Sequence, residues 1–157
     1  MVRIENKVLN QINSSCANAQ EELIIESCVI NNIEWNCFNP NFFISINNCI
    51  INKLHIYCAW FEGGFFFKNN IVKETVNYEM GGHNKKPFIM DGNVFLGFID
   101  FFDCQFDAEV NITNNIFTKG TSLLGNKGQG FSNLFEHGYA IEGNIGKLDL
   151  DFEGQNT

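Results

Sequence analysis

Arginine, proline and long apolar runs are scarce in this chain, and each shortage argues against a class of protein. Arg3 is the only arginine, and only two prolines occur in 157 residues. No apolar run approaches the roughly 18–20 residues that a membrane-spanning helix needs, and the first ten residues, MVRIENKVLN, lack the apolar centre of a signal peptide. We therefore expect a soluble, cytoplasmic protein that does not enter a membrane. The shortage of guanidinium groups also disfavours an enzyme that binds sugar carboxylates.

The net charge and the cysteine spacing disfavour two further kinds of site. The formal net charge is −8, so the chain lacks the basic face that displaces counterions from nucleic acid. A basic or neutral protein is the partner that this charge favours. The six cysteines form no CxxC pair and no Cys/His cluster at zinc spacing. We expect no metal, no cofactor and reduced thiols.

Phenylalanine, asparagine and one short recurring phrase are abundant. At 157 residues and 45% apolar composition, with 17 phenylalanines, the chain suits one domain with a substantial core. The phrase occurs as NNCII (47–51), KNNIV (68–72), DGNVF (91–95), TNNIF (113–117) and EGNIG (142–146). Such recurrence indicates a repeat architecture.

One position in each phrase anchors the repeat. The spacings between successive anchors are 21, 21, 21, 23, 22 and 29. Each anchor is followed by a β-branched aliphatic residue, and the positions five and three before it are apolar from Leu23 and Ile25 to Tyr139 and Ile141. The anchors are Lys7, Cys28, Cys49, Asn70, Asn93, Asn115 and Asn144.

Apolar residues two apart mark one face of a strand. A strand that repeats about every 22 residues predicts parallel coils, each burying its inward residues against the next. We place Val29, Ile50 and Ile71, which follow three of the anchors, inside this stack. The domain spans 1–157, with a first coil or N-terminal cap in 1–26, regular coils in 27–146, loop insertions at 80–87 and 125–138, and a C-terminal capping strand and tail in 147–157.

The anchors and the residues before them predict a corner of the coil. Stacked asparagines can bond to the asparagines of adjacent coils and so satisfy their amides below the surface. The preceding residues tolerate left-handed or tight-turn geometry; they are Ser27, Asn48, Asn69, Gly92, Asn114 and Gly143. The recurring phrase is therefore assigned a structural role and no catalytic one.

A coil whose period runs from 21 to 23, with an asparagine-lined turn, resembles the right-handed parallel β-helix of the pectin-lyase-like superfamily. The resemblance covers most of the chain and concerns architecture, with no signature of a specific family. It implies an all-β fold, a single-stranded right-handed β-solenoid of about six to seven coils. It implies no function, because this scaffold hosts lyases, hydrolases, adhesins and binding proteins alike.

Two groups of residues are candidate binding sites. The first is an outward apolar strip four residues before the anchors, formed by Ile24, Phe66 and Ile89, which is either a protein contact or a surface covered by a loop or terminal segment. The second is a loop edge whose residues suit acid–base chemistry on a sugar acid or are simply solvated. The loop-edge residues are Trp60, Glu62, His83, Lys85, Lys86, Asp103, Asp107 and His137.

Three functions of different classes remain open. The first is a non-catalytic protein-binding β-helix, for instance a bacterial immunity protein that neutralises a toxin. The second is a carbohydrate-binding or carbohydrate-cleaving protein that uses the loop edge. The third is a self-assembling scaffold resembling the bactofilins. The expected partner is another protein, and a homodimer through a coil end or the apolar strip is the alternative.

Overall fold

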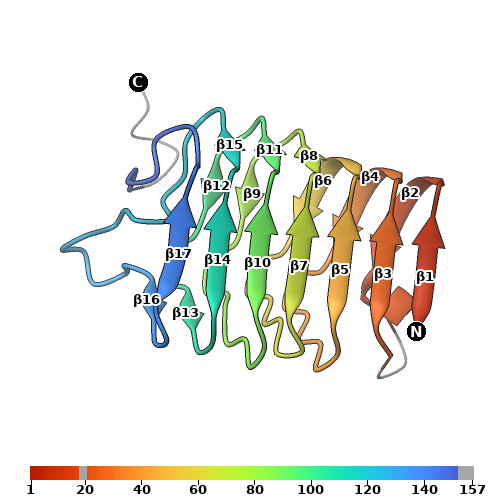
Figure 1. The fold of residues 1–157 in the computed structure, drawn as a ribbon, viewed down its shortest axis with the longest axis horizontal. Helices are drawn as coiled ribbons and strands as arrows, with labels where there is room; N and C mark the ends of the chain where they lie inside the picture. The colour runs from red at the N-terminus through yellow and green to blue at the C-terminus, as the bar shows by residue number, and fades with distance from the viewer. Residues whose placement is uncertain (18–20, 152–157) are drawn as a thin grey trace.

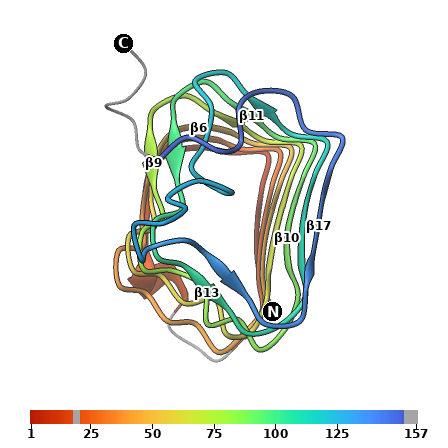
Figure 2. The same cartoon turned by 90° about the vertical axis from the view of Figure 1, so that its left-hand side faces the viewer.

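The computed structural model describes residues 1–17 and 21–151, which form a right-handed parallel β-helix (Figure 1). Figure 2 looks along the stack from its C-terminal end, so the chain approaches the viewer. It rises along β10 (Phe88–Asp91) and β17 (Tyr139–Glu142), crosses the top and descends past β9 (Val76–Asn77). This counter-clockwise advance gives the predicted right-handed coil. Residues 18–20 of the predicted first coil and 152–157 of the predicted tail lie outside the described residues.

Two long sheets and two short strand pairs form the sides of the coil. The seven-stranded sheet contains β1 (Val2–Glu5), β3 (Leu23–Glu26), β5 (Ile44–Asn47), β7 (Phe65–Lys68), β10, β14 (Val110–Thr113) and β17. The six-stranded sheet contains β2 (Val8–Asn13), β4 (Val29–Glu34), β6 (Ile50–His55), β8 (Ile71–Val72), β11 (Val94–Phe95) and β15 (Ile116–Phe117). The pairs are β9 with β12 (Ile99–Asp100), and β13 (Gln105–Phe106) with β16 (Leu134–Phe135).

Helical structure is almost absent from the described residues. They contain one short 3-10 helix, η1 (Ser14–Ala17). No helix in residues 1–17 and 21–151 is long and apolar enough to cross a membrane.

The predicted register is confirmed along the stack. Val2 pairs with Leu23 and Val110 with Tyr139, so the first sheet follows the predicted spacing from its shortest interval to its longest. The chain completes about five turns of the β-helix, slightly fewer than the six to seven predicted. After β17 the described residues add no further strand; they join the preceding coil through the bridge from Ile145 to Ile116 and through backbone hydrogen bonds of Thr121 and Leu124.

Aromatic rings stacked between coils explain the abundance of phenylalanine. Phe95 lies over Phe117 with ring centroids 5.4 Å apart and an interplanar angle of 7°. Phe106 lies over Phe135 at 5.2 Å, also at 7°. Because neighbouring strands are about 4.8 Å apart, rings at equivalent positions meet nearly face to face, offset as aromatic pairs prefer. The positions five and three before the anchors fill the rest of the core from Leu23 and Ile25 to Val110 and Ile112, as predicted, but the last members are not buried: Tyr139 is 55% exposed and Ile141 is half-buried.

The residue after each anchor lies on the outside of the coil, so our placement of Val29, Ile50 and Ile71 inside the stack was wrong. Ile71 is 37% exposed, whereas the next residue, Val72, is fully buried. The anchor side chains occupy the inside of the corner, and side chains alternate across a strand, so the following residue must point outward. The pairing register was right, and the assignment of faces was shifted by one residue.

The anchor asparagines form a buried ladder that joins successive coils, as predicted. Asn93 Oδ1 accepts hydrogen bonds from the backbone N–H and the Nδ2 of Asn70, at 2.9 and 3.1 Å. Asn93 Nδ2 donates to Asn115 Oδ1 at 2.9 Å and to the carbonyl oxygen of Phe67 at 2.7 Å. The residue before the anchor has a positive φ, 54° at Asn69 and 69° at Gly92, which glycine and asparagine tolerate best.

Loss of one ladder amide will destabilise the protein. Asn93→Ala removes the partners of the Asn70 N–H and the Phe67 carbonyl oxygen inside the core. We expect the free energy of unfolding to fall by about 2–4 kcal/mol, because buried polar groups lose their hydrogen bonds. Urea denaturation measures this free energy of unfolding in the variant and in the wild type. The control is Asn31→Ala on the outer surface, where Asn31 Nδ2 donates to Asn10 Oδ1 at 3.4 Å; its expected cost is below about 0.5 kcal/mol. Equal losses would contradict the assignment.

Adjacent residues of β8 test the corrected assignment of faces. Val72→Asp places an unpaired carboxylate in the core and should lower the free energy of unfolding by several kcal/mol, roughly 3 or more. Ile71→Asp keeps its carboxylate in solvent and should cost about 1 kcal/mol or less. Chemical denaturation of both variants gives the comparison. A larger loss for Ile71→Asp than for Val72→Asp would refute the outward placement of Ile71.

Candidate functional site

The residues after the anchors form a continuous apolar line on the outer face of the six-stranded sheet, which we call the aliphatic file. Successive members pair in adjacent coils, and a single bridge adds the last. The exposed fraction reaches 85% at Val8. Contiguous exposed apolar surface of this kind marks an interaction site. The aliphatic file consists of Val8, Val29, Ile50, Ile71, Val94, Ile116 and Ile145.

Lysines flank the aliphatic file. The five-residue segments that begin at the seven anchors contain five lysines and a single acidic residue, Glu74, although the whole chain has a net charge of −8. Glu74 lies 3.9 Å from Lys53 Nζ. This side of the protein is therefore locally basic, and the acidic residues lie mainly on the other sides. The five lysines are Lys7, Lys53, Lys73, Lys119 and Lys147, and all are exposed.

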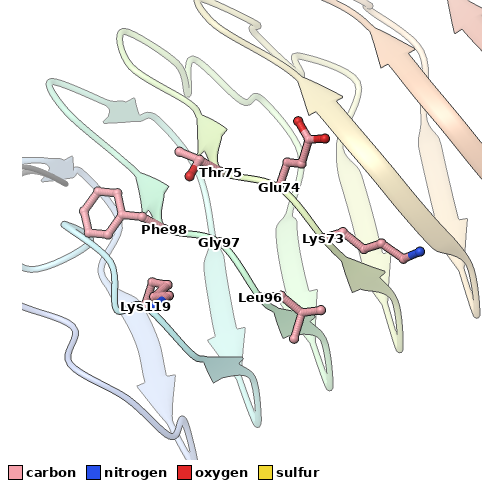
Figure 3. Close-up of a pocket in the computed structure, with 7 residues that line it drawn as sticks. All are labelled: Lys73, Glu74, Thr75, Leu96, Gly97, Phe98 and Lys119. Atoms are coloured by element: carbon pink, nitrogen blue, oxygen red, sulfur yellow. The ribbon is translucent and has the colours of Figure 1, made fainter.

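A hollow of about 550 Å³ adjoins the aliphatic file across three coils (Figure 3). A Cβ atom on Gly97 would lie 2.3 Å from the backbone nitrogen of Thr75, so only glycine permits these coils to approach so closely. Two lysines and one glutamate surround its apolar part, so the hollow offers both apolar and charged contacts. Its lining is Lys73, Glu74 and Thr75 from one coil, Leu96, Gly97 and Phe98 from the next, and Lys119 from the third.

The sequence contains a signal that could have revealed the aliphatic file. The residues two after the anchors are also apolar in six coils, and they become phenylalanine at Phe95 and Phe117. Consecutive residues of a strand cannot both point inward. The larger residues belong in the core, so the smaller β-branched column belongs outside.

The predicted apolar strip lies on the other sheet and is interrupted. Ile24, Phe66 and Ile89 are half-buried on the outer face of the seven-stranded sheet. Ser45, which is only 6% exposed, separates Ile24 from Phe66. The Phe43 ring packs edge-on against Phe66 at 4.8 Å, and Lys68 Nζ lies 5.2 Å from the centre of the Phe66 ring. Less apolar surface is therefore free here than along the aliphatic file.

Five predicted loop-edge residues form three contacts. The Trp60 and His83 rings lie 4.4 Å apart, and His83 Nδ1 is 3.1 Å from Asp107 Oδ2. Lys85 Nζ donates to Glu62 Oε2 at 2.6 Å. The backbone of this segment belongs to the coil wall, because Gly82 forms parallel bridges with both Trp60 and Gln105.

The remaining loop-edge residues lie outside these three contacts. Asp103 occupies a left-handed turn with φ of 54°, and its backbone N–H donates to the Phe131 carbonyl oxygen at 3.0 Å. Lys86 and His137 are exposed. Across residues 1–17 and 21–151, no group of three or more His, Cys, Asp or Glu side chains is arranged to hold a metal ion.

The Trp60–His83–Asp107 cluster adjoins a smaller hollow of about 330 Å³, which Asp107 and Glu136 line together with Gln105, Phe106, Leu134 and Phe135. The carboxylate of Asp107 orients the imidazole, and the indole provides an aromatic face. Such an edge can hydrogen-bond a polar ligand and stack against it.

Comparisons of the chain with models of known protein families, with characterised proteins and with solved structures find no match. The function is therefore argued from the residues themselves.

Removal of the His83 ring will expose Trp60. His83→Asn keeps a residue that tolerates the φ of 50° at this position, and it removes the imidazole that covers the indole. We expect acrylamide to quench the fluorescence of Trp60 more strongly in the variant. The second tryptophan, Trp35, is fully buried and provides a constant background. A quenching curve identical to that of the wild type would show that the two rings are not in contact in solution.

Proposed function

We propose that the protein is a non-catalytic, protein-binding β-helix that holds its partner on the aliphatic file. The observation that carries the proposal is the file itself, with β-branched aliphatic residues outward in every coil from Val8 to Ile145. An interface typically combines a desolvated apolar centre with a polar rim. The aliphatic file and its flanking lysines have this composition.

The charged residues around the aliphatic file indicate which charge the contact surface of the partner carries. Net charge alone favours a basic or neutral partner, but the five flanking lysines favour a surface with carboxylates around an apolar centre. Complementary charges at the rim accelerate association and orient the two surfaces. The hollow lined by Lys73, Glu74 and Lys119 is a position for one polar or charged side chain of the partner.

A bacterial immunity protein that neutralises a toxin is one instance of such a binder. The acidic net charge supports this instance. In this case the toxin would present the carboxylate-bearing apolar surface. A neighbouring gene for a large secreted toxin would add further support.

Carbohydrate binding at the loop edge is the second candidate. It is favoured by the contact of the Trp60 ring with the His83 ring and by the pair of carboxylates, Asp107 and Glu136, that line one hollow. Calorimetric titration with uronic-acid oligosaccharides tests it directly. Binding that is lost in Trp60→Ala would establish this candidate.

A pair of matched double variants tests the proposed contact surface. Ile50→Thr with Ile71→Thr keeps β-branched residues in the strands and makes the aliphatic file polar. Ile24→Thr with Ile89→Thr does the same on the other sheet and serves as the control. Each tagged protein is used to isolate partners from its native host, followed by quantitative mass spectrometry. We expect one partner to be retained by the wild type and the control, and to be lost about tenfold or more with the file variant.

The binding affinity of the purified partner then decides the question. An equal dissociation constant for both double variants would refute the aliphatic file as the contact surface. A partner lost only with the control variant would move the site to the strip of Ile24, Phe66 and Ile89. Sedimentation of the protein alone reveals a second copy as the occupant, because the wild type would then form dimers that the file variant does not.

A further inference from the structure

A second corner of the coil places two accessible cysteines in adjacent coils. The backbone N–H of Cys37 donates to the Tyr57 carbonyl oxygen at 2.7 Å, which sets Cys37 in register with Cys58. Both residues have left-handed backbone conformations, with φ of 51° and 54°. Cys37 is exposed and Cys58 is partly exposed, and both are free thiols. Burial raises the pKa of Cys58, and proximity to Cys37 contributes to this rise, in agreement with this register.

The other described cysteines occupy a different environment. Cys28 and Cys49 also lie at equivalent positions of adjacent coils, but their exposed fractions are only 2% and 1%. Their sulfur atoms donate to the carbonyl oxygens of Glu26 and Asn47, both at 3.2 Å. Burial raises the pKa of Cys49 to about 11, and that of Cys104, which is fully buried, rises further. These three thiols are protected from reagents in solution, and two of them are held largely in the unreactive protonated form.

The geometry of the Cys37 and Cys58 pair suits a disulfide bond. Residues in register on neighbouring parallel strands have Cα atoms about 4.8 Å apart, and disulfides span Cα separations of about 4.4–6.8 Å. The register of the two residues therefore brings their side chains to adjacent positions on the same corner. Burial raises the pKa of Cys58, with a further contribution from Cys37, so the more exposed Cys37 is the better first nucleophile.

We propose that Cys37 and Cys58 form a redox-responsive pair that closes a disulfide between coils on reaction with a small disulfide such as oxidised glutathione. The Cys37 thiolate attacks one sulfur of the small disulfide, forms a mixed disulfide and releases one thiolate. The Cys58 thiolate then attacks the sulfur of Cys37 and releases the second thiolate. The two protein thiols are oxidised, the small disulfide is reduced to two thiols, and the two protons of the protein thiols pass to the released thiolates.

The closed disulfide joins two coils across one corner. It closes the chain between Cys37 and Cys58 into a loop of one full coil, which restricts the unfolded state. The corner lies beside the loop edge, where Tyr57 OH donates to Met80 Sδ at 3.4 Å and Trp60 Nε1 donates to the Met80 carbonyl oxygen at 3.1 Å. The pair therefore controls how firmly the coils around Trp60 are held together.

Oxidation of the folded protein with glutathione disulfide tests the proposal. Cys16 precedes Cys37 by the same interval that separates Cys37 from Cys58, so the experiment uses a Cys16→Ser background as well as the wild type. After alkylation of the remaining thiols, cleavage at Lys53 separates Cys37 from Cys58. Fragmentation of the linked peptides by mass spectrometry then identifies the joined cysteines, because the peptide that ends at Lys53 also contains Cys28 and Cys49. We expect one cross-link, between Cys37 and Cys58, and a melting temperature that rises by about 10 °C on oxidation.

Two single variants provide the controls. Cys37→Ser should lose both the cross-link and the rise in melting temperature, and Cys49→Ser should keep both. The measurement on reduced protein shows that each variant is folded before oxidation. The proposal is overturned if both cysteines remain fully alkylated after oxidation, or if the cross-link joins either of them to a different cysteine.

Discussion

The hydrogen bonding of the buried corner is the constraint on which the rest of the structure depends. Each coil turns sharply after the strand of the seven-stranded sheet, and the turn leaves backbone groups inside the protein. The amides of Asn70, Asn93 and Asn115 satisfy these groups from one coil to the next. Because a buried polar group without a partner is costly, the ladder fixes which residue points inward at the corner. Because side chains alternate across a strand, the inward residue at the corner determines which side chains of the next strand point inward.

This dependence explains how much of the fold the sequence predicted. Pairing from Val8 to Ile145 follows from the spacing of the anchors, since a repeated pattern can only stack on itself in one register. The face of Ile71 did not follow, because a β-branched residue suits a strand whether it points inward or outward. The buried asparagine before it carried that information.

The candidate sites were predicted unevenly for a similar reason. Contacts within the loop edge, such as Trp60 with His83 and Lys85 with Glu62, join residues about one coil apart, so the repeat alone brought them near each other. The lysines around the aliphatic file differ in their distance from the anchors, from zero at Lys7 to four at Lys53. They do not occupy one equivalent position of the repeat. That they lie on the same side of the protein could be recognised only from the structure of the coil.

The spacing of the coils also has a consequence for the size of the outer surface. The first three intervals between anchors are equal, so the coils that begin at Lys7, Cys28 and Cys49 are interchangeable in length. Duplication or loss of one such unit would leave the pairing of every other coil intact. The contact area would then lengthen or shorten in whole steps of about 4.8 Å, and a lineage of such proteins could match partners of different length by changing the number of units.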